Sequence, residues 1–356
     1  MRAMGWPVFR AKQVWEWVYL KLVADPALMT NLSMTDRQKL SQRFIFADGQ
    51  VTRRQTSEDG TDKLLITWPG GANAETVMIP DGDRRTACVS SQVGCPVGCK
   101  FCASGLEGMK GNLSAGQIVE QVWRLNKVMS EHATPVPDFQ RGSKVPFGSR
   151  ITNIVFMGMG EPLSNYAQVM KAIRIVHDRA GLNIGARRIT VSTVGVAPKM
   201  RELAHEDLPL NLAISLHAPT ESLRRELIPW AEHFSIEEIL NAARYYFDQT
   251  GREITLEYIL LSGVNDQPEH ARQLAKVCKT LRANVNLIRY NEVSTLPFKR
   301  PVGDDVVVFQ NILRNAGVNA HVRKSRGRDI DAACGQLRRN EQQGQLVALG
   351  VPAPGV

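Results

Sequence analysis

The sequence of 356 residues contains no apolar run long enough to cross a bilayer. Its first fifteen residues include basic side chains but no apolar segment followed by a small-residue cleavage site, so we expect no signal peptide. No internal repeat of fixed period occurs, and hydrophobic residues make up 43% and charged residues 22% of the chain. These values exclude collagen, coiled coils and wholesale disorder. We therefore expect a cytoplasmic protein that has no membrane partner.

Cysteine is scarce in this chain, and acidic residues are outnumbered by basic ones. In a cytosolic chain, six cysteines favour metal binding or catalysis over structural disulfides. The 44 Lys and Arg residues exceed the 35 Asp and Glu residues, which gives a formal net charge of +9. A basic excess of this size favours a polyanionic partner.

The hydrophobic pattern divides the chain into units. They are predicted to be a small N-terminal helical accessory domain (residues 1–50), a β-hairpin extension (51–83), an α/β core (84–335) and a flexible C-terminal tail (336–356). In the first unit, one helical stripe consists of Ala11, Val14, Trp15, Val18 and Leu22. Thr35 with Gln38 predicts the start of a second helix. Residues 131–150 are rich in Pro, Gly and Ser and predict a surface loop.

The core is predicted to alternate strands with helices. The strand candidates are residues 86–94, 151–158, 188–194, 211–217, 253–261 and 284–290. Helix starts are predicted at Ser114 with Gln117, at Ser235 with Glu238, and at Asp266 before Pro268 and Glu269. Six strand–helix units in series predict a parallel α/β fold.

The strongest local signal is the triplet Cys95, Cys99 and Cys102, which follows the first core strand. Three thiolates this close in sequence can surround one [4Fe–4S] cluster and leave one iron without a protein ligand. The alternative is a zinc site in which Cys88 is the fourth ligand, although structural zinc more often uses two separated ligand pairs.

Polar side chains and glycines also recur where the later strands are predicted to end. They are Gly158, Gly160 and Glu161 after the second strand, Ser192 in the third, Ser215 and His217 at the fourth, and Tyr290 with Asn291 at the sixth. Each has an ordinary structural explanation by itself, such as a turn or a helix cap. Because the carboxyl ends of parallel barrel strands line the active site, their recurrence predicts a shared site.

These motifs resemble those of known enzymes. The CxxxCxxC loop, with Phe101 before its last cysteine, resembles the radical S-adenosylmethionine superfamily, and Glu161 resembles that superfamily's contact to the methionine amino group. The longer motifs resemble the RlmN/Cfr family of RNA adenosine methyltransferases, particularly its RlmN branch, from residue 9 to residue 337. They are CVSSQVGC (88–95), FMGMGEP (156–162), RITVSTVG (188–195), LAISLHA (212–218) and DIDAACGQL (329–337).

The resemblance implies a partial (β/α)6 barrel with an RNA-facing N-terminal region. It implies a [4Fe–4S] cluster on Cys95, Cys99 and Cys102, and two molecules of S-adenosylmethionine per turnover. The S-adenosylmethionine contacts that it implies are Gly160, Glu161, Ser192, Ser215, Leu216, His217 and Asn291. Cys334 would carry a methyl group, Cys88 would form a disulfide with it, and Glu75 would accept a proton.

The implied activity is methylation of C2 of an adenosine in 23S rRNA, and of the adenosine 3′ of the anticodon in some tRNAs. The implied electron donor is a low-potential protein such as flavodoxin or ferredoxin. For the RNA, the dense basic run at residues 323–328 predicts phosphate contacts from Arg323, Lys324, Arg326 and Arg328. Cys278 lies on an apolar helix face and is predicted to be a core residue without a chemical role.

Two alternatives remain at the level of sequence. One is C8 methylation of adenosine, as in the Cfr branch, because both branches share the mechanistic residues. The other is a non-catalytic RNA-binding protein stabilised by a metal, which would not require Cys88, Glu161 and Cys334 together.

Overall fold

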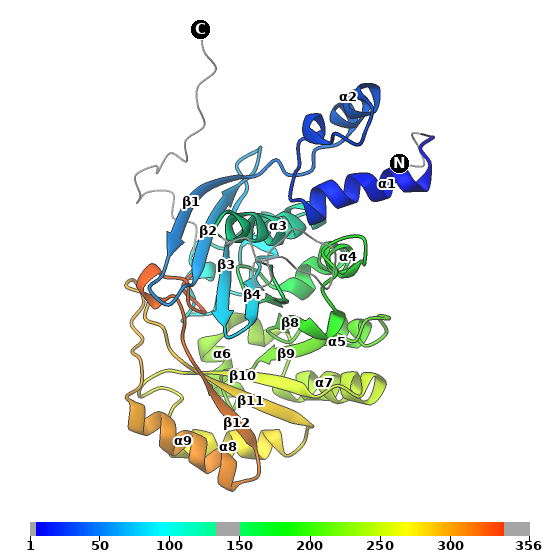
Figure 1. Cartoon of the computed structure of the whole chain (residues 1–356). Coiled ribbons are helices and arrows are strands. Elements are labelled where there is room, and N and C mark those ends of the chain that lie inside the picture. The colour runs from blue at the N-terminus through cyan, green and yellow to red at the C-terminus, as the bar shows by residue number, and fades with distance from the viewer. Residues whose placement is uncertain (1–4, 133–149, 338–356) are drawn as a thin grey trace.

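The computed structural model describes residues 5–132 and 150–337. Its main sheet has ten strands in the order β1-β2-β3-β4-β7-β8-β9-β10-β11-β12, and it is open, with β1 and β12 at its edges (Figure 1). The strands are β1 (Gln50–Thr56), β2 (Asp62–Thr67), β3 (Asn73–Asp81), β4 (Arg84–Cys88), β7 (Asn153–Phe156), β8 (Ile189–Thr193), β9 (Asn211–Ser215), β10 (Ile254–Leu260), β11 (Ala283–Arg289) and β12 (Asn319–Arg323).

Parallel pairing runs from β4 through β12, which confirms the predicted parallel α/β core. Strands such as β10 read as nearly continuous apolar runs, because both faces of a parallel sheet are covered. The helices are α3 (Ala115–His132), α4 (Tyr166–His177), α5 (Ala197–Leu203), α6 (Glu221–Leu227), α7 (Ile236–Thr250), α8 (Pro268–Cys278) and α9 (Gly303–Asn315). Figure 1 shows α4, α5 and α7 along one side of the sheet and α8 and α9 beside its last strands. In the described part of the chain, no helix is suited by length and hydropathy to cross a membrane.

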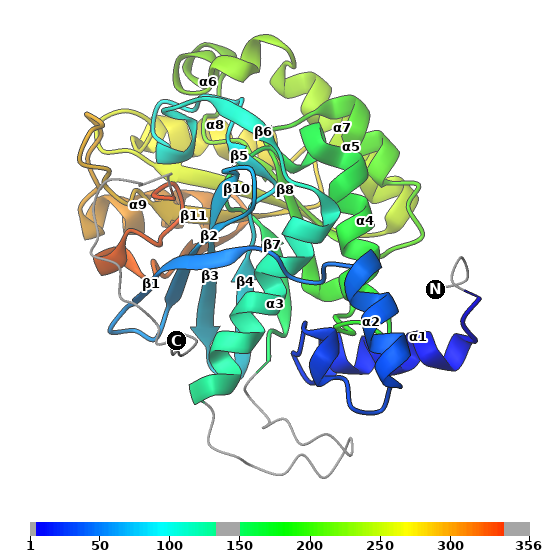
Figure 2. The ribbon, with the colours of Figure 1, turned by 90° about the horizontal axis from the view of Figure 1, so that it is seen from above.

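The N-terminal unit is helical, as predicted. Its helices are α1 (Val8–Trp15), continued by a π-helical turn (Glu16–Leu20), and α2 (Met34–Arg43). The turn keeps Val14, Val18 and Leu22 buried but leaves Trp15 39% exposed, so Trp15 does not belong to the predicted apolar stripe. The buried residues pack on Trp123 of α3, whose indole N–H donates to the Val18 carbonyl oxygen at 2.7 Å. Helix α3 therefore anchors this unit to the core (Figure 2).

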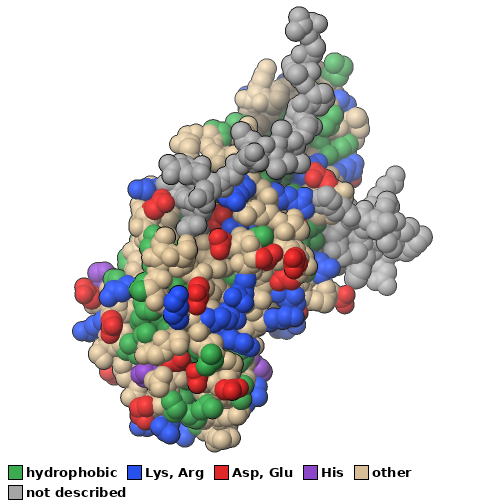
Figure 3. Space-filling model, turned by 90° about the vertical axis from the view of Figure 1, so that its left-hand side faces the viewer, with side chains coloured by type: hydrophobic (Ala, Val, Ile, Leu, Met, Phe, Trp, Pro, Cys, Tyr) green, Lys and Arg blue, Asp and Glu red, His purple; other side chains and the backbone are tan. Residues whose placement is uncertain are grey.

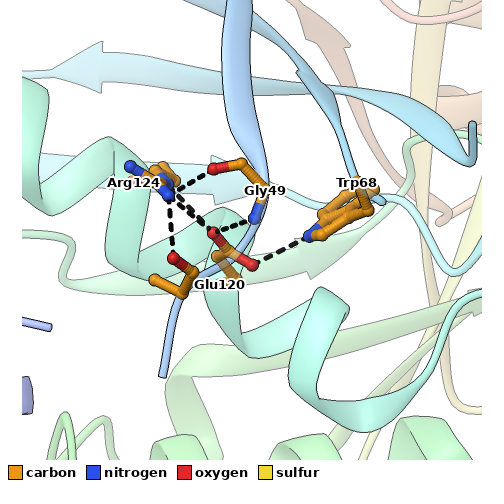
Figure 4. A network of polar contacts seen from close by, with 5 residues as sticks. Gly49, Trp68, Glu120 and Arg124 are labelled. Carbon is orange, nitrogen blue, oxygen red and sulfur yellow. Dashed lines mark hydrogen bonds and ion pairs between the residues drawn. The ribbon is translucent and has the colours of Figure 1, made fainter. Parts of the chain in front are cut away.

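A buried polar network joins the same helix to the hairpin strands (Figure 4). The Glu120 carboxylate accepts from the Gly49 N–H at 3.0 Å and from the Trp68 indole N–H at 2.8 Å, and it pairs with Arg124 at 2.9 Å. Gly49 is required here because a Cβ atom would lie 2.6 Å from the Trp68 indole nitrogen. One carboxylate thus fixes the point where the chain passes from the N-terminal helices into β1.

The predicted hairpin at residues 51–83 is present as β2 and β3, and β1 extends it to three antiparallel strands. The predicted first core strand, residues 86–94, is divided. Its first part is β4, and its second part is β5 (Gln92–Gly94), which leaves the main sheet and pairs with β6 (Met109–Asn112). Strand β12 was not predicted, since it is only five residues long and has just two apolar side chains, Ala320 and Val322.

The predicted helix starts were right at two positions and wrong at two. Ser114 with Gln117 and Ser235 with Glu238 form the expected reciprocal bonds. Helix α2 is capped by Ser33 instead of Thr35, because Ser33 Oγ accepts from the Asp36 N–H at 3.1 Å. Helix α8 is capped by Gln267 instead of Asp266, because Pro268 occupies the first helical position.

The predicted loop at 131–150 and tail at 336–356 fall almost wholly outside the described residues. Gln336 and Leu337, at the predicted start of the tail, are buried, being 6% and 3% exposed. The packed part of the chain therefore extends at least to residue 337.

Candidate active site

A cavity lies at the carboxyl ends of the parallel strands, as the recurring polar side chains predicted. It brings together most of the predicted site residues. Those that line it are Cys95, Cys99, Cys102, Gly160, Glu161, Ser192, Ser215, His217 and Cys334. Leu216 and Asn291 are buried close to lining residues, and Cys88 and Glu75 are buried but do not line the cavity.

The three cysteines lie in the loop that β5 and β6 close. Gly94 closes the base of this loop at φ +76°, where a Cβ atom would lie 2.0 Å from the Gly108 carbonyl oxygen. Burial raises the pKa of the Cys95 thiol to about 12, and it also raises those of Cys99 and Cys102, with a further contribution from the charges of neighbouring thiolates. The protein alone therefore disfavours three thiolates here, and binding to a cation would reverse this.

Glycines shape the turn after β7. A Cβ atom on Gly158 would lie 2.7 Å from Ser90 Oγ, and one on Gly160, at φ +101°, would lie 2.7 Å from the Gln92 Cβ atom. This tight turn brings Glu161 to the cavity wall. Its carboxylate accepts from the Val194 N–H at 2.7 Å and the Leu163 N–H at 2.9 Å. Burial nevertheless raises the pKa of Glu161 to about 7.

The end of β9 is held in an unusual conformation. His217 has φ +58°, a region that residues other than glycine rarely adopt. Asn265 holds it there by donating to the His217 and Ile259 carbonyl oxygens at 2.8 and 2.6 Å. His217 Nδ1 accepts from the Ile259 N–H at 3.1 Å, and burial lowers the pKa of His217 to about 3. The imidazole is therefore neutral and carries its proton on Nε2.

The segment that carries Cys334 is bound to the cysteine loop. The Ala103 N–H donates to the Gly335 carbonyl oxygen at 2.8 Å, and Ser104 Oγ donates to the Leu337 carbonyl oxygen at 2.7 Å. On its other side, Asn291 Nδ2 donates to the Cys334 carbonyl oxygen at 3.3 Å. These bonds place a fourth thiol at the same cavity as the cysteine triplet, although it comes from a distant part of the chain.

Cys88 lies at the end of β4 and is 6% exposed. Burial raises the pKa of its thiol to about 12; the negative charge of Cys334 adds to this, and the positive charge of Arg323 opposes it. Cys88 and Cys334 are thus electrostatically coupled, with Arg323 close to both. All six cysteines of the chain are free thiols in this structure.

Arg323 was predicted to contact RNA phosphate, but the structure places it at the cavity. Its guanidinium pairs with Glu257 at 3.5 Å, and the charge of an ionised Cys334 is the main reason that the pKa of Arg323 is raised. The sequence could not separate Arg323 from its basic neighbours, because β12, which carries it to the cavity, was not predicted. Glu257 was missed because it interrupts an otherwise apolar strand.

Glu75 lies on β3 and is 4% exposed. Its carboxylate pairs with Lys63 of β2 at 3.1 Å, and the same ammonium group donates to the Asp331 carbonyl oxygen at 3.1 Å. Ser57 Oγ adds a 2.6 Å bond to Asp329. The hairpin extension is therefore connected to the segment that carries Cys334.

Comparisons with known proteins identify the family. Residues 1–46 match the family described as the ribosomal RNA large subunit methyltransferase N-terminal domain, and residues 146–275 match the radical SAM superfamily. The probable dual-specificity RNA methyltransferase RlmN of Dictyoglomus thermophilum is 44% identical over 338 residues, which are 95% of this chain and 92% of that protein. The RlmN protein of Symbiobacterium thermophilum, described in the same words, is 45% identical over 345 residues, or 96% and 89% of the two chains. This chain belongs to the RlmN family of radical SAM RNA methyltransferases.

A solved structure agrees with this assignment. The crystal structure of a radical SAM methyltransferase from Sphaerobacter thermophilus matches with a TM-score of 0.88 at 43% identity, over 95% of each chain. Family membership sets aside the non-catalytic RNA-binding alternative, and the radical SAM fold that the sequence motifs implied is confirmed.

Radical SAM enzymes use a [4Fe–4S] cluster and S-adenosylmethionine, and the residues at the cavity of this RlmN-family chain suit both. The donors are soft thiols, the ligand type that iron–sulfur clusters take. Within the described ranges, no three His, Cys, Asp or Glu side chains converge on one metal ion. A cluster does not require such convergence, since its thiolates bind different irons. Cys95, Cys99 and Cys102 would hold the cluster, and Glu161 and the strand ends would hold S-adenosylmethionine.

Replacing Cys95, Cys99 or Cys102 by Ala should abolish cluster assembly, because each change removes one thiolate from a three-thiolate site. The measurement is iron content and visible absorption after anaerobic reconstitution, with about four irons per wild-type chain expected and close to none in each variant. Cys278→Ala is the matched control, since Cys278 is also a free thiol but lies in the core on α8, away from the cavity. A triplet variant that kept its iron would refute the ligand assignment.

Proposed function

We propose that this enzyme methylates C2 of an adenosine in 23S rRNA, and also the adenosine 3′ of the anticodon in some tRNAs. The relatives are described as dual-specificity RNA methyltransferases, which is consistent with two RNA substrates. The observation that carries the proposal is that Cys334 lines one cavity with Glu161 and the cysteine triplet. A thiol beside a radical-generating centre offers a route to an adenine carbon that is not nucleophilic enough for direct methyl transfer.

Cys334 is the proposed methyl carrier. Its sulfur, as thiolate, takes a methyl group from one molecule of S-adenosylmethionine. When bound, the cluster and a second S-adenosylmethionine supply a 5′-deoxyadenosyl radical. The S-methyl group of Cys334 loses a hydrogen atom and then bonds to C2 of adenine, which joins the enzyme to the RNA. Arg323 lines the cavity together with Cys334, so its positive charge is available to a thiolate formed there.

Two more residues complete the proposed reaction. Glu75 accepts the proton from C2, and its ion pair with Lys63, which also contacts the Asp331 carbonyl, supports a position near the Cys334 segment. Cys88, as thiolate, attacks the Cys334 sulfur, so that a disulfide forms and the sulfur–carbon bond breaks. The released carbon takes a proton to become the methyl group, and the unpaired electron left from the hydrogen abstraction passes to a one-electron acceptor such as the oxidised form of the electron-transfer protein. Coupling of the Cys88 thiol to the charge of Cys334 supports this pairing.

RNA contact is proposed through exposed basic side chains. Figure 3 shows Lys and Arg side chains across the middle of one face, interspersed with Asp and Glu. Of the run at 323–328, Lys324 and Arg328 are exposed, whereas Arg326 pairs with Asp59 and Asp81 at 4.0 and 3.7 Å. The N-terminal unit adds exposed Lys12, Lys39 and Arg43.

We propose flavodoxin or ferredoxin as the electron donor, since radical formation consumes one electron.

The regiochemistry can be tested directly on the product. Purified enzyme with a protein-free 23S rRNA fragment, S-adenosylmethionine and a reductant should yield 2-methyladenosine on nuclease digestion and mass spectrometry. The retention time against synthetic standards distinguishes it from 8-methyladenosine, the product of the alternative C8 reaction. A product that comigrated only with 8-methyladenosine would overturn the C2 proposal while leaving the Cys334 mechanism intact.

Cys88→Ala should trap the enzyme on its RNA. Cys334 and the cluster ligands remain, so addition to adenine should still occur, but no thiol can complete the disulfide. A nuclease-sensitive shift of the protein band on a denaturing gel is the expected signature.

Two further variants control this result. Cys88→Ala combined with Cys334→Ala should lose the shift, because the attachment point is gone, and Cys278→Ala should release RNA normally. If Cys88→Ala bound iron and RNA but formed no covalent adduct, the role assigned to Cys88 would be wrong.

A further inference from the structure

Arg224 of α6 is a buried cation that forms no ion pair within 4.0 Å among the residues that the structure describes. It is 1% exposed, and its guanidinium donates only to backbone carbonyl oxygens, that of Val194 at 2.5 Å and that of Phe234 at 3.4 Å. Its Nε atom has no hydrogen-bond partner among the described residues. A buried cation without a close ion pair is costly, so its presence points to an anionic partner in addition to the more distant charge of Glu221.

Helix α6 carries this charge to the back of the cysteine loop. The Lys100 N–H, next to Cys99, donates to the carbonyl oxygen of Leu227 at the end of α6, at 3.0 Å. Leu223 and Leu227, on either side of Arg224, belong to the same apolar cluster as the three cysteines. Water is thus largely excluded between the guanidinium and the thiols, which strengthens the interaction of their charges.

The charge of Arg224 also acts on groups near the cavity. Burial lowers the pKa of His217, and the charge of Arg224 adds to this effect. Among side chains, Glu221 on the same helix and Cys99 are the groups that favour the charged form of Arg224.

We propose that Arg224 is the buried countercharge of the iron–sulfur cluster and raises its reduction potential. A cubane on three thiolates has a net negative charge, which increases when it takes up an electron. A fixed cation beside it therefore stabilises the reduced form more than the oxidised form, and the net charge around a cluster is one of the factors that set its potential. Arg224 is a positioning residue in addition, since Val194, which it holds, donates to Glu161.

The test is the midpoint potential of the reconstituted cluster, measured by spectroelectrochemistry in the absence of S-adenosylmethionine and RNA. Arg224→Gln retains a side-chain donor but loses the charge and should shift the potential to more negative values. Arg224→Lys retains the charge and should stay near the wild type. Arg225→Gln is the matched control, because Arg225 is the next residue on α6 but is exposed, and it should cause no shift.

Glu221→Gln should shift the midpoint potential in the opposite direction. It keeps the Oε1 acceptor for the Ile236 N–H but removes a negative charge that partly offsets Arg224, so the potential should rise. If Arg224→Gln fails to load iron, Glu221→Gln still tests the proposal, and an unchanged midpoint potential in Glu221→Gln would overturn it. Equal potentials in wild type and Arg224→Gln, or equal shifts in the Gln and Lys variants, would also overturn it. Because no RNA is present, these outcomes are independent of the proposed C2 chemistry.

Discussion

The bond from the Ala103 N–H to the Gly335 carbonyl oxygen connects the two halves of the active site. One half is the loop after β4, in which three thiols lie close together in sequence. The other is the segment after β12, which carries Cys334. Ser104, Asn291 and the hairpin residue Lys63 add further bonds to that segment. If this attachment were lost, the cavity would retain the triplet and Glu161 but would lack the thiol that the proposed methyl transfer requires.

Burial of charge is the second constraint on the site. Glu161, Glu257 and Arg224 are buried, Arg323 is half-buried, and each is stabilised differently. Glu161 accepts from two backbone N–H groups, Glu257 pairs with Arg323, and Arg224 donates to two backbone carbonyl oxygens. Arg224 lies on α6, which contacts the cysteine loop, whereas Arg323 lines the cavity together with Cys334. This separation suits a site that combines electron uptake at one set of sulfurs with thiolate chemistry at another.

Much of the fold was predictable from the sequence, for identifiable reasons. Strands β7 to β11 are short segments with apolar residues that end at turn or polar residues, and two helices begin with reciprocal Ser–Glu or Ser–Gln caps. The local sequence pattern was therefore sufficient to predict these elements. Strand β12 alternates polar and apolar residues, and its pairing with β11 is a tertiary property. The cysteine triplet was evident from its spacing. The positions of Arg323 and Arg224 were not evident, because an arginine at a cavity or in the core has the same sequence signature as an exposed one, and only packing separates Arg224 from Arg225.

The account depends most on Cys334 being the methyl carrier, and mass spectrometry of the protein tests this directly. Enzyme purified anaerobically from cells that supply S-adenosylmethionine should yield a peptide containing Cys334 that is heavier by about 14 Da, the mass of one CH2 unit, as expected for a methylated sulfur nucleophile. Fragmentation should assign the added mass to the sulfur of Cys334 and leave Cys88 unmodified. Fully active enzyme in which Cys334 is found only as the free thiol would contradict the account.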